Sequence, residues 1–162
     1  MTMPDRAEES TRIKDAGIKL FKKGYYERAL EKFEAADSTV QPLRDDPHRF
    51  NPIHYNLQHN ISVCHLKLKQ WHEVETFSNK ILEINPEDVK ALYRRGISRK
   101  ELWNYDAALS DFSTAKAVME VKGETGEGNY KEICAEWQKT KKLEREANVR
   151  EKELFKNVFS AL

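Results

Sequence analysis

The feature that most constrains this chain is a pattern of small and aromatic residues that recurs within it. Two frames of about 34 residues, beginning at Ser10 and Val89, carry the same residue types at the same positions. In the first frame these residues are Gly17, Tyr26, Ala29, Phe33 and Ala36; in the second they are Gly96, Tyr105, Ala108, Phe112 and Ala115. A middle frame from Tyr55 matches weakly but ends with Pro86 at its terminal position. Such a period indicates an array of stacked structural units.

Each unit is expected to be a pair of antiparallel helices. The glycines and alanines at the shared positions allow the two helices of a pair to approach closely, and Phe33 and Phe112 are expected to fill the space between successive pairs. One pair cannot bury its own apolar face, whereas three stacked pairs can. The positions are those of the tetratricopeptide repeat (TPR), a helix–turn–helix unit. We therefore expect an all-α fold with three TPR hairpins in a right-handed superhelix, followed by a long C-terminal capping helix.

The repeat frames and the turn signals predict the domain boundaries. Residues 1–9 form an N-terminal tail or helix start, the repeats span 10–43, 55–88 and 89–122, and residues 123–129 form a turn before a capping helix at 130–162. The connection from Arg44 to His54 is longer than a tight turn. Helices are expected near 8–22, 26–39, 52–68, 71–84, 87–101 and 105–120. Residues 130–159 contain no Gly or Pro, and Trp137 and Leu143 are expected to contact the last hairpin.

Composition excludes several classes of function. Among 162 residues, 28 Lys and Arg nearly balance 27 Asp and Glu, so the net charge of +1 argues against a general nucleic-acid binder. There is no apolar run of about 18 residues and no secretory signal, which favours a cytoplasmic or nuclear protein without membrane contact. Phosphate-binding loops, G-x-S-x-G and H-E-x-x-H are absent, so neither an enzyme nor a cofactor is expected.

The cysteines and histidines do not predict a metal site. Cys64 and Cys134 lie far apart without a C-x-x-C partner, so both are expected to be free thiols. His54, His59 and His65 are close in sequence, but their spacing does not place them on one helix face, and ordinary helix-surface histidines are the better interpretation.

The first helix of each TPR hairpin lines the concave surface of such an array, so polar residues there are candidates for binding. Lys14, Asn60, Lys90 and Arg94 fall on these helices, and the last two are one helical turn apart. Three cations and an amide suit a pair of carboxylates, such as a C-terminus beside an Asp side chain. With 28 basic residues, a chance placement of three on one face is the alternative interpretation.

Two strings resemble a known family. Asn60 begins NISVCHLKL and Lys90 begins KALYRRG, and with the ending REKELFKNVF these resemble the C-terminal TPR domains of large immunophilins. Those are FKBP-type and forty-kilodalton cyclophilin-type peptidyl-prolyl isomerases that act as co-chaperones. The resemblance covers about residues 14–159. It implies either an excised co-chaperone domain or a stand-alone relative, without the many short strands of the isomerase domain.

The resemblance also implies the roles of particular residues. In that family the groove is a carboxylate clamp for the EEVD tail of heat-shock protein 90, with the heat-shock protein 70 tail as a related target. The implied clamp residues are Lys14, Asn60, Lys90 and Arg94, and the implied groove wall is Ile18, Val63, Leu66 and Lys67. At position 18 many clamp domains have Asn, and Ile cannot hydrogen-bond a terminal carboxylate.

Two alternatives stay open. A TPR scaffold could bind another protein segment through apolar contacts in the groove, with its charges only solvating the surface. The final helix is basic and amphipathic, which is typical of calmodulin targets and is a site assigned to the resembling family, but Glu144, Glu146, Glu151 and Glu153 dilute its basic face.

Overall fold

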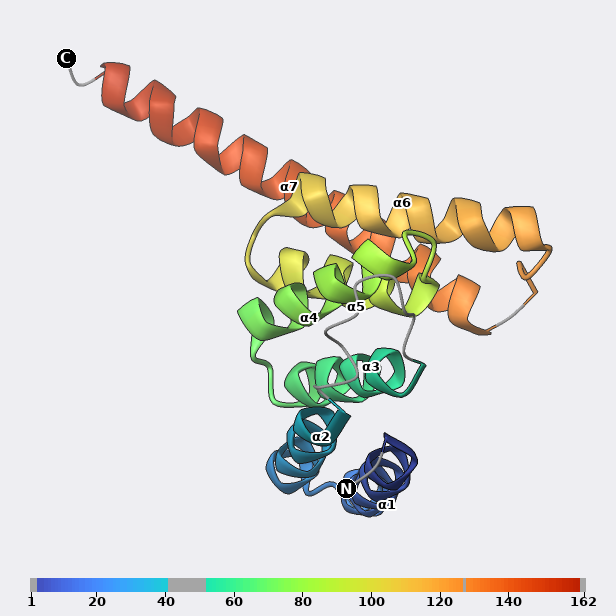
Figure 1. Ribbon diagram of the computed structural model, residues 1–162. Coiled ribbons are helices and arrows are strands. Elements are labelled where there is room, and N and C mark those ends of the chain that lie inside the picture. The colour runs from blue at the N-terminus through green and yellow to red at the C-terminus, as the bar shows by residue number, and fades with distance from the viewer. Residues whose placement is uncertain (1–2, 41–51, 127, 161–162) are drawn as a thin grey trace. The chain divides into compact units, whose positions relative to one another are not determined.

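The structure, a computed structural model, describes residues 3–40, 52–126 and 128–160. Within these ranges it contains seven α-helices and no strand, which confirms the all-α prediction (Figure 1). The helices are α1 (Met3–Lys22), α2 (Tyr26–Val40), α3 (Pro52–Lys67), α4 (Trp71–Ile84), α5 (Val89–Glu101), α6 (Tyr105–Lys122) and α7 (Gly128–Ser160). Most of the predicted Arg44–His54 connection lies outside the described residues.

Three helix starts differ from the sequence prediction, and one of them is that of α7, which begins at Gly128 and not at residue 130. Helix α1 begins at Met3, before the expected residue 8, because Pro4 in the first turn needs no intrahelical hydrogen bond and Asp5 complements the helix dipole. Helix α5 begins at Val89 and not at 87, because Asp88 is its N-cap. The Asp88 carboxylate accepts a hydrogen bond of 2.8 Å from the backbone N–H of Ala91.

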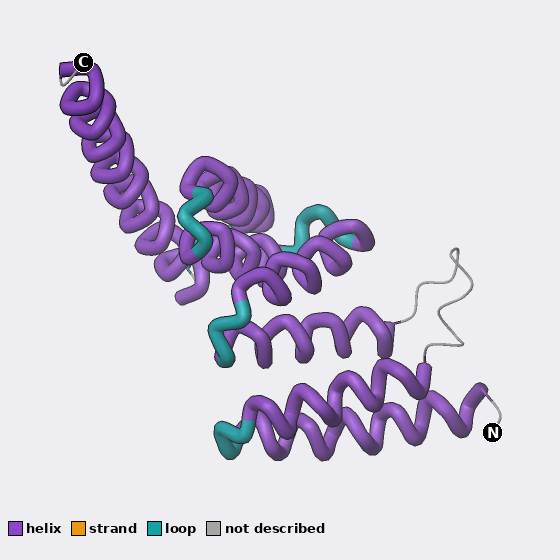
Figure 2. Tube along the Cα trace, turned by 90° about the vertical axis from the view of Figure 1, so that its left-hand side faces the viewer, coloured by secondary structure: helices purple, strands orange, loops and turns teal. Residues whose placement is uncertain are grey.

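Short loops join the two helices of each hairpin, α1 to α2, α3 to α4 and α5 to α6 (Figure 2). Each loop has one residue with a positive φ angle: Gly24 at 82°, Lys69 at 57° and Trp103 at 64°. Glycine adopts this conformation without steric cost, whereas Lys69 and Trp103 adopt it against their side-chain preference. The helix contacts within each pair hold these two residues in place.

The chain divides into two compact units, Met1–Pro86 and Glu87–Leu162, called here the first and second unit. In the first unit the apolar core consists of Ala29, Phe33, Ala36, Val40, Leu57, Ile61 and Cys64, from α2 and α3. The Phe33 ring also lies directly against Gly17 of α1, where an added Cβ would come within 2.7 Å of Cε1. Phe33 therefore packs both within its hairpin and against the next one.

In the second unit Phe112 is fully buried, and its ring lies against Gly96 of α5, where an added Cβ would come within 2.6 Å of Cε1. The ring also contacts Tyr93 of the same helix, with centroids 6.1 Å apart. Phe112 thus fills the space inside its own hairpin, and its packing between successive hairpins stays a prediction. The missing glycine Cβ creates the room for the ring.

The first half of α7 covers the last hairpin. Ile133 and Thr140 are buried, and the Trp137 indole Nε1–H donates a hydrogen bond of 3.0 Å to Ser113 Oγ of α6. The expected contact of Trp137 with the last hairpin is thereby confirmed. Farther along α7, Leu154, Phe155, Val158 and Phe159 are exposed. None of the described helices combines the length and apolar character needed to cross a bilayer.

Both cysteines are free, as expected. Cys64 lies in the core of the first unit, and burial raises the pKa of its thiol to about 12. Among the described residues no group of three or more His, Cys, Asp or Glu side chains could hold a metal ion. His54 instead pairs with Asp37 through Nδ1, and His65 stacks on Phe77.

Candidate peptide-binding site

The predicted site residues lie on α1, α3 and α5, the first helices of the three hairpins. Lys14, Ile18, Asn60, Val63, Leu66 and Lys67 belong to the first unit, in which α1 contacts α3, and Lys90 and Arg94 belong to the second.

Lys14 and Ile18 are one turn apart on α1 and share one side of that helix. The Lys14 side chain is 25% exposed, and its Nζ lies 3.8 Å from the carboxylate of the neighbouring Asp15. At this distance, and with Asp15 59% exposed, the pair is weak and leaves the ammonium available to a ligand. Ile18 is half-buried and packs against the core of the first unit.

Helix α3 has two distinct faces. Leu57, Ile61 and Cys64 are buried in the core. Asn60 and Lys67 share another face, because they are two turns apart, with Asn60 half-buried and Lys67 exposed. Val63 lies between them and Leu66 beside it, both half-buried. The apolar residues of the predicted groove wall are therefore half-buried, whereas Lys67 is exposed.

Lys90 and Arg94 are one turn apart on α5. Lys90 is exposed, and among the described residues it forms no hydrogen bond or ion pair. Arg94 is half-buried, and burial lowers the pKa of its guanidinium from the ordinary value, while the nearby Asp88 carboxylate acts in the opposite direction. An arginine remains cationic at neutral pH despite such a shift. Both residues therefore carry positive charge.

The other cations of α5 serve the packing of the second unit. Asp111 of α6, whose side chain is 4% exposed, accepts hydrogen bonds from the Arg95 guanidinium at 2.7–3.2 Å and from Arg99 at 3.0 Å. Lys100 Nζ lies 2.7 Å from the Glu136 carboxylate of α7. Sequence reasoning did not separate these three cations from the two predicted site residues, because their partners lie 12 to 36 positions away in the chain.

Known proteins resemble this chain in sequence and in fold. No family profile matches the chain. Peptidyl-prolyl cis-trans isomerase FKBP4 of Bos taurus is 25% identical over 166 residues, which cover 100% of this chain and 34% of that protein. Peptidyl-prolyl cis-trans isomerase PASTICCINO1 of Arabidopsis thaliana is 34% identical over 110 residues, 65% of this chain and 17% of that protein. The chain thus spans a third or less of these relatives.

Solved structures of TPR domains have the same fold as this chain. The C-terminal TPR-containing domain of a Plasmodium falciparum FK506-binding protein superposes with a TM-score of 0.73 at 18% identity, covering 91% of this chain and 96% of that domain. The chain therefore has the fold of a TPR domain, and its sequence is similar to part of the FKBP-type isomerases. The first TPR of Spaghetti (RPAP3), solved bound to the HSP90 peptide SRMEEVD, has a TM-score of 0.65 at 21% identity and covers 85% of this TPR domain and 94% of its own chain. The fold matched in each case is a protein-binding module and not an isomerase domain.

Proposed function

We propose that this TPR domain is a co-chaperone-type binding module, not an enzyme, and that it holds the C-terminal EEVD tail of a heat-shock protein 90 or 70 chaperone. The clamp residues are Lys14, Asn60, Lys90 and Arg94. The observation that carries the proposal is that the basic residues of α5 differ in their ion pairs. Three cations are neutralised by carboxylates of the same unit, whereas Lys90 is exposed without an ion pair.

The neighbours in structure support the choice of ligand. Besides the RPAP3 domain with its HSP90 peptide, the second TPR domain of human RPAP3 was solved with the HSP70 peptide SGPTIEEVD. Both peptides end in EEVD, so the two carboxylates of the last residue and the preceding glutamates present several negative charges. A cationic groove recognises that chemistry directly.

The energetics of the proposed clamp are sufficient. A hydrogen bond to a charged group contributes about 1.5–3 kcal/mol, so three cations and one amide can offset the cost of ordering the tail and leave micromolar affinity, about −8 kcal/mol. Because Lys90 is exposed and Lys14 is partly exposed, added salt screens these contacts. We expect the affinity to fall as the salt concentration rises.

At position 18 the proposed clamp has an apolar residue, Ile18. Its side chain offers no hydrogen bond to the terminal carboxylate, and it is anchored in the core of the first unit. In the proposed complex the terminal carboxylate depends on Lys14 and Asn60, while Ile18, Val63 and the aliphatic stem of Lys67 form the wall against apolar side chains of the tail. Leu66 completes that wall.

The test is a titration of a fluorescein-labelled peptide ending in MEEVD, followed by fluorescence anisotropy. Lys90→Glu should weaken binding by about tenfold or more, about 1.4 kcal/mol, because it replaces an attraction by a repulsion. Amidation of the peptide C-terminus should weaken binding to a similar degree. Lys131→Glu is the matched control, since it makes the same charge change at an exposed position of α7 outside the proposed clamp.

Equal affinity of wild type, Lys90→Glu and the amidated peptide would refute the clamp. Binding that survives both changes but falls on Val63→Ala would instead support the alternative, a TPR scaffold that binds a protein segment through apolar contacts. Circular dichroism of each variant verifies that the helices are intact.

The exposed end of α7 favours calmodulin as a second candidate partner. Leu154, Phe155, Val158 and Phe159 present apolar side chains that are 57–71% exposed. Three basic residues of α7 already form ion pairs within the helix: Lys139 with Glu136, Lys141 with Glu144, and Lys142 with Glu146. A calorimetric titration with Ca²⁺-loaded calmodulin tests this: heat that disappears in Phe155→Ala supports it, and the absence of binding by wild type rejects it.

A further inference from the structure

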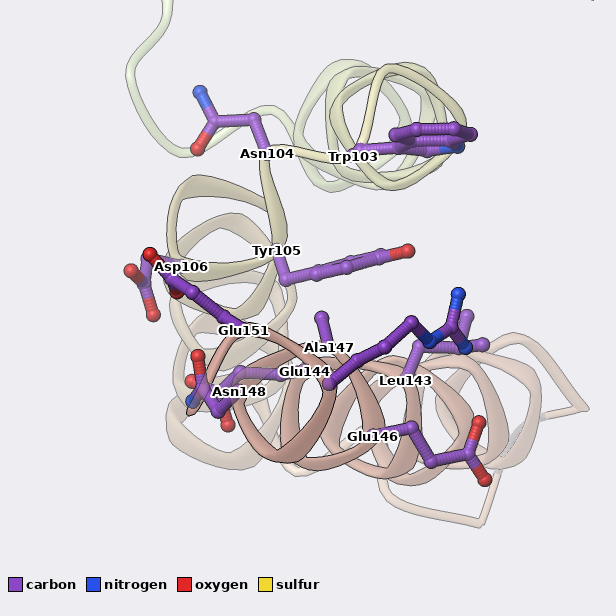
Figure 3. Close-up of a pocket in the computed structure, with 11 residues that line it drawn as sticks. Trp103, Asn104, Tyr105, Asp106, Leu143, Glu144, Glu146, Ala147, Asn148 and Glu151 are labelled. Atoms are coloured by element: carbon purple, nitrogen blue, oxygen red, sulfur yellow. The ribbon is translucent and has the colours of Figure 1, made fainter. Parts of the chain in front are cut away.

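A concave site lies within the second unit, and none of the predicted clamp residues line it. It is a pocket of about 540 Å³ between the loop that joins α5 to α6 and the middle of α7. Trp103 and Tyr105 line one side, and Leu143 and Ala147 line the other, with the Tyr105 ring extending between the indole and α7 (Figure 3). Of these residues only Tyr105 belongs to the repeat pattern, and the clamp proposal uses none of them.

Trp103 is the most conspicuous member of this pocket. Its side chain is 80% exposed although tryptophan is the largest apolar residue, and it occupies a loop position with a φ angle of 64° that glycine adopts at lower cost. The backbone N–H of Trp103 donates to Lys100 O at 3.0 Å, so the loop that presents the indole is ordered. An indole that exposed buries little area in the fold and is available to a ligand.

The polar groups of the pocket are mainly acidic. Asp106, Glu144, Glu146 and Glu151 line it together with a single cation, Arg150. Lys141 lies 2.6 Å from the Glu144 carboxylate and Lys142 lies 3.8 Å from that of Glu146. Across the described part of the chain, Asp106 and Glu151 form no ion pair.

Asp106 of α6 and Glu144 of α7 lie near each other. The hydrogen bond from Lys141, assisted by the charges of Lys141 and Arg145, holds the pKa of the Glu144 carboxyl below its usual value, so Glu144 remains ionised at neutral pH. With Glu144 paired to Lys141 and Glu146 paired to Lys142, the lining keeps the carboxylates of Asp106 and Glu151 and one cation, Arg150. A cation of a partner would be attracted to these two carboxylates. These carboxylates line the same pocket as the indole and the phenol ring (Figure 3).

We propose that this pocket docks a basic peptide segment, with a Lys or Arg side chain of the partner directed to Asp106 and Glu151 and an adjacent apolar residue against Trp103 and Leu143. The complementarity of charge selects a cation, and the aromatic wall adds apolar burial for the adjacent residue. The required ligand is opposite in charge to the acidic tail proposed for the clamp. The two sites therefore bind different segments, and this inference stands independently of the proposed function.

The probe is the fluorescein-labelled peptide acetyl-GLKRLKG-amide, followed by anisotropy, with the neutral peptide acetyl-GLQQLQG-amide as comparison. Trp103→Ala should weaken binding of the basic peptide about tenfold, and Trp103→Phe should retain most of the affinity. Asp106→Asn and Glu151→Gln should each weaken it about threefold. Glu124→Gln, the same loss of charge at an exposed position outside the pocket, should have no effect.

Arg150 provides a test of opposite sign. Because its guanidinium competes with the incoming cation, Arg150→Gln should strengthen binding about threefold. The indole N–H resonance of Trp103 should shift in a ¹H–¹⁵N NMR titration, while those of Trp71 and Trp137 remain in place. Lys90→Glu should leave the basic peptide bound as before.

Three results would overturn the proposal: equal binding of the basic and neutral peptides, an unchanged affinity of Trp103→Ala, or weaker binding by Arg150→Gln. Trp103 and Arg150 are exposed, so these variants fold, as a circular dichroism spectrum of each will verify.

Discussion

Gly96→Ala should destabilise the second unit, although alanine is the better helix former. The added Cβ would lie 2.6 Å from Phe112 Cε1 and 2.9 Å from both Cδ1 and Cζ, far inside ordinary carbon contacts. Phe112 is fully buried, so its ring cannot move aside without displacing its neighbours. Overpacking of this kind costs about 1–3 kcal/mol, and alanine's helix propensity offsets about 1 kcal/mol of that. We expect a net loss of about 1 kcal/mol in the free energy of unfolding.

The assay is urea unfolding followed by circular dichroism at 222 nm, with Gly128→Ala as the matched control. Gly128 begins α7, and an added Cβ there would meet nothing within 4 Å, so this substitution should stabilise by up to about 1 kcal/mol. The same chemical change thus has opposite signs at two helical positions. The difference comes only from the ring of Phe112.

A double-mutant cycle isolates that cause. Phe112→Leu removes the ring atoms that clash, so in its background Gly96→Ala should become neutral or stabilising, with a coupling of about 1 kcal/mol or more. If Gly96→Ala stabilises the wild-type protein as much as Gly128→Ala does, or if the cycle shows no coupling, the close approach of α5 and α6 is not what the glycine serves.

Asp111→Asn should lower the free energy of unfolding by about 2–3 kcal/mol, because it leaves the Arg95 and Arg99 guanidinium groups without their shared carboxylate. Urea unfolding measures this loss, and a change below about 0.5 kcal/mol would contradict the prediction. Cys64 should react with iodoacetamide at pH 8.5 at least about a hundredfold more slowly than Cys134, because burial raises the pKa of its thiol to about 12 from 9.0. The Cys64 thiol ionises at a lower pH in the unfolded chain than in the folded protein. Its contribution to the free energy of unfolding is therefore complete below pH 9 and is lost as the pH rises from 9 towards 12. Cys64→Ala should flatten that part of the stability profile, and an unchanged profile would speak against the assignment.

The sequence by itself determined the helical hairpins. Helix periodicity, the loop residues and the spacing of Gly17 and Gly96 to Phe33 and Phe112 are local signals, each acting over about one repeat, so they can be read without knowledge of the fold. The small shifts at the starts of α1 and α5 come from capping by single side chains, which is also local but finer than the repeat pattern. The candidate site followed from the same register, because a position on the first helix of a hairpin predicts its face.

Tertiary structure decided which charges and aromatic residues are available to a partner. Lys90 and Arg95 look alike in the sequence, yet Arg95 is held by Asp111, 16 residues away, and Lys90 has no ion pair in the described parts of the chain. Likewise, the pocket of Trp103 exists only because α7 returns to the loop between α5 and α6, about 40 residues earlier. Both outcomes depend on contacts between segments distant in the sequence, and no local pattern specifies such contacts.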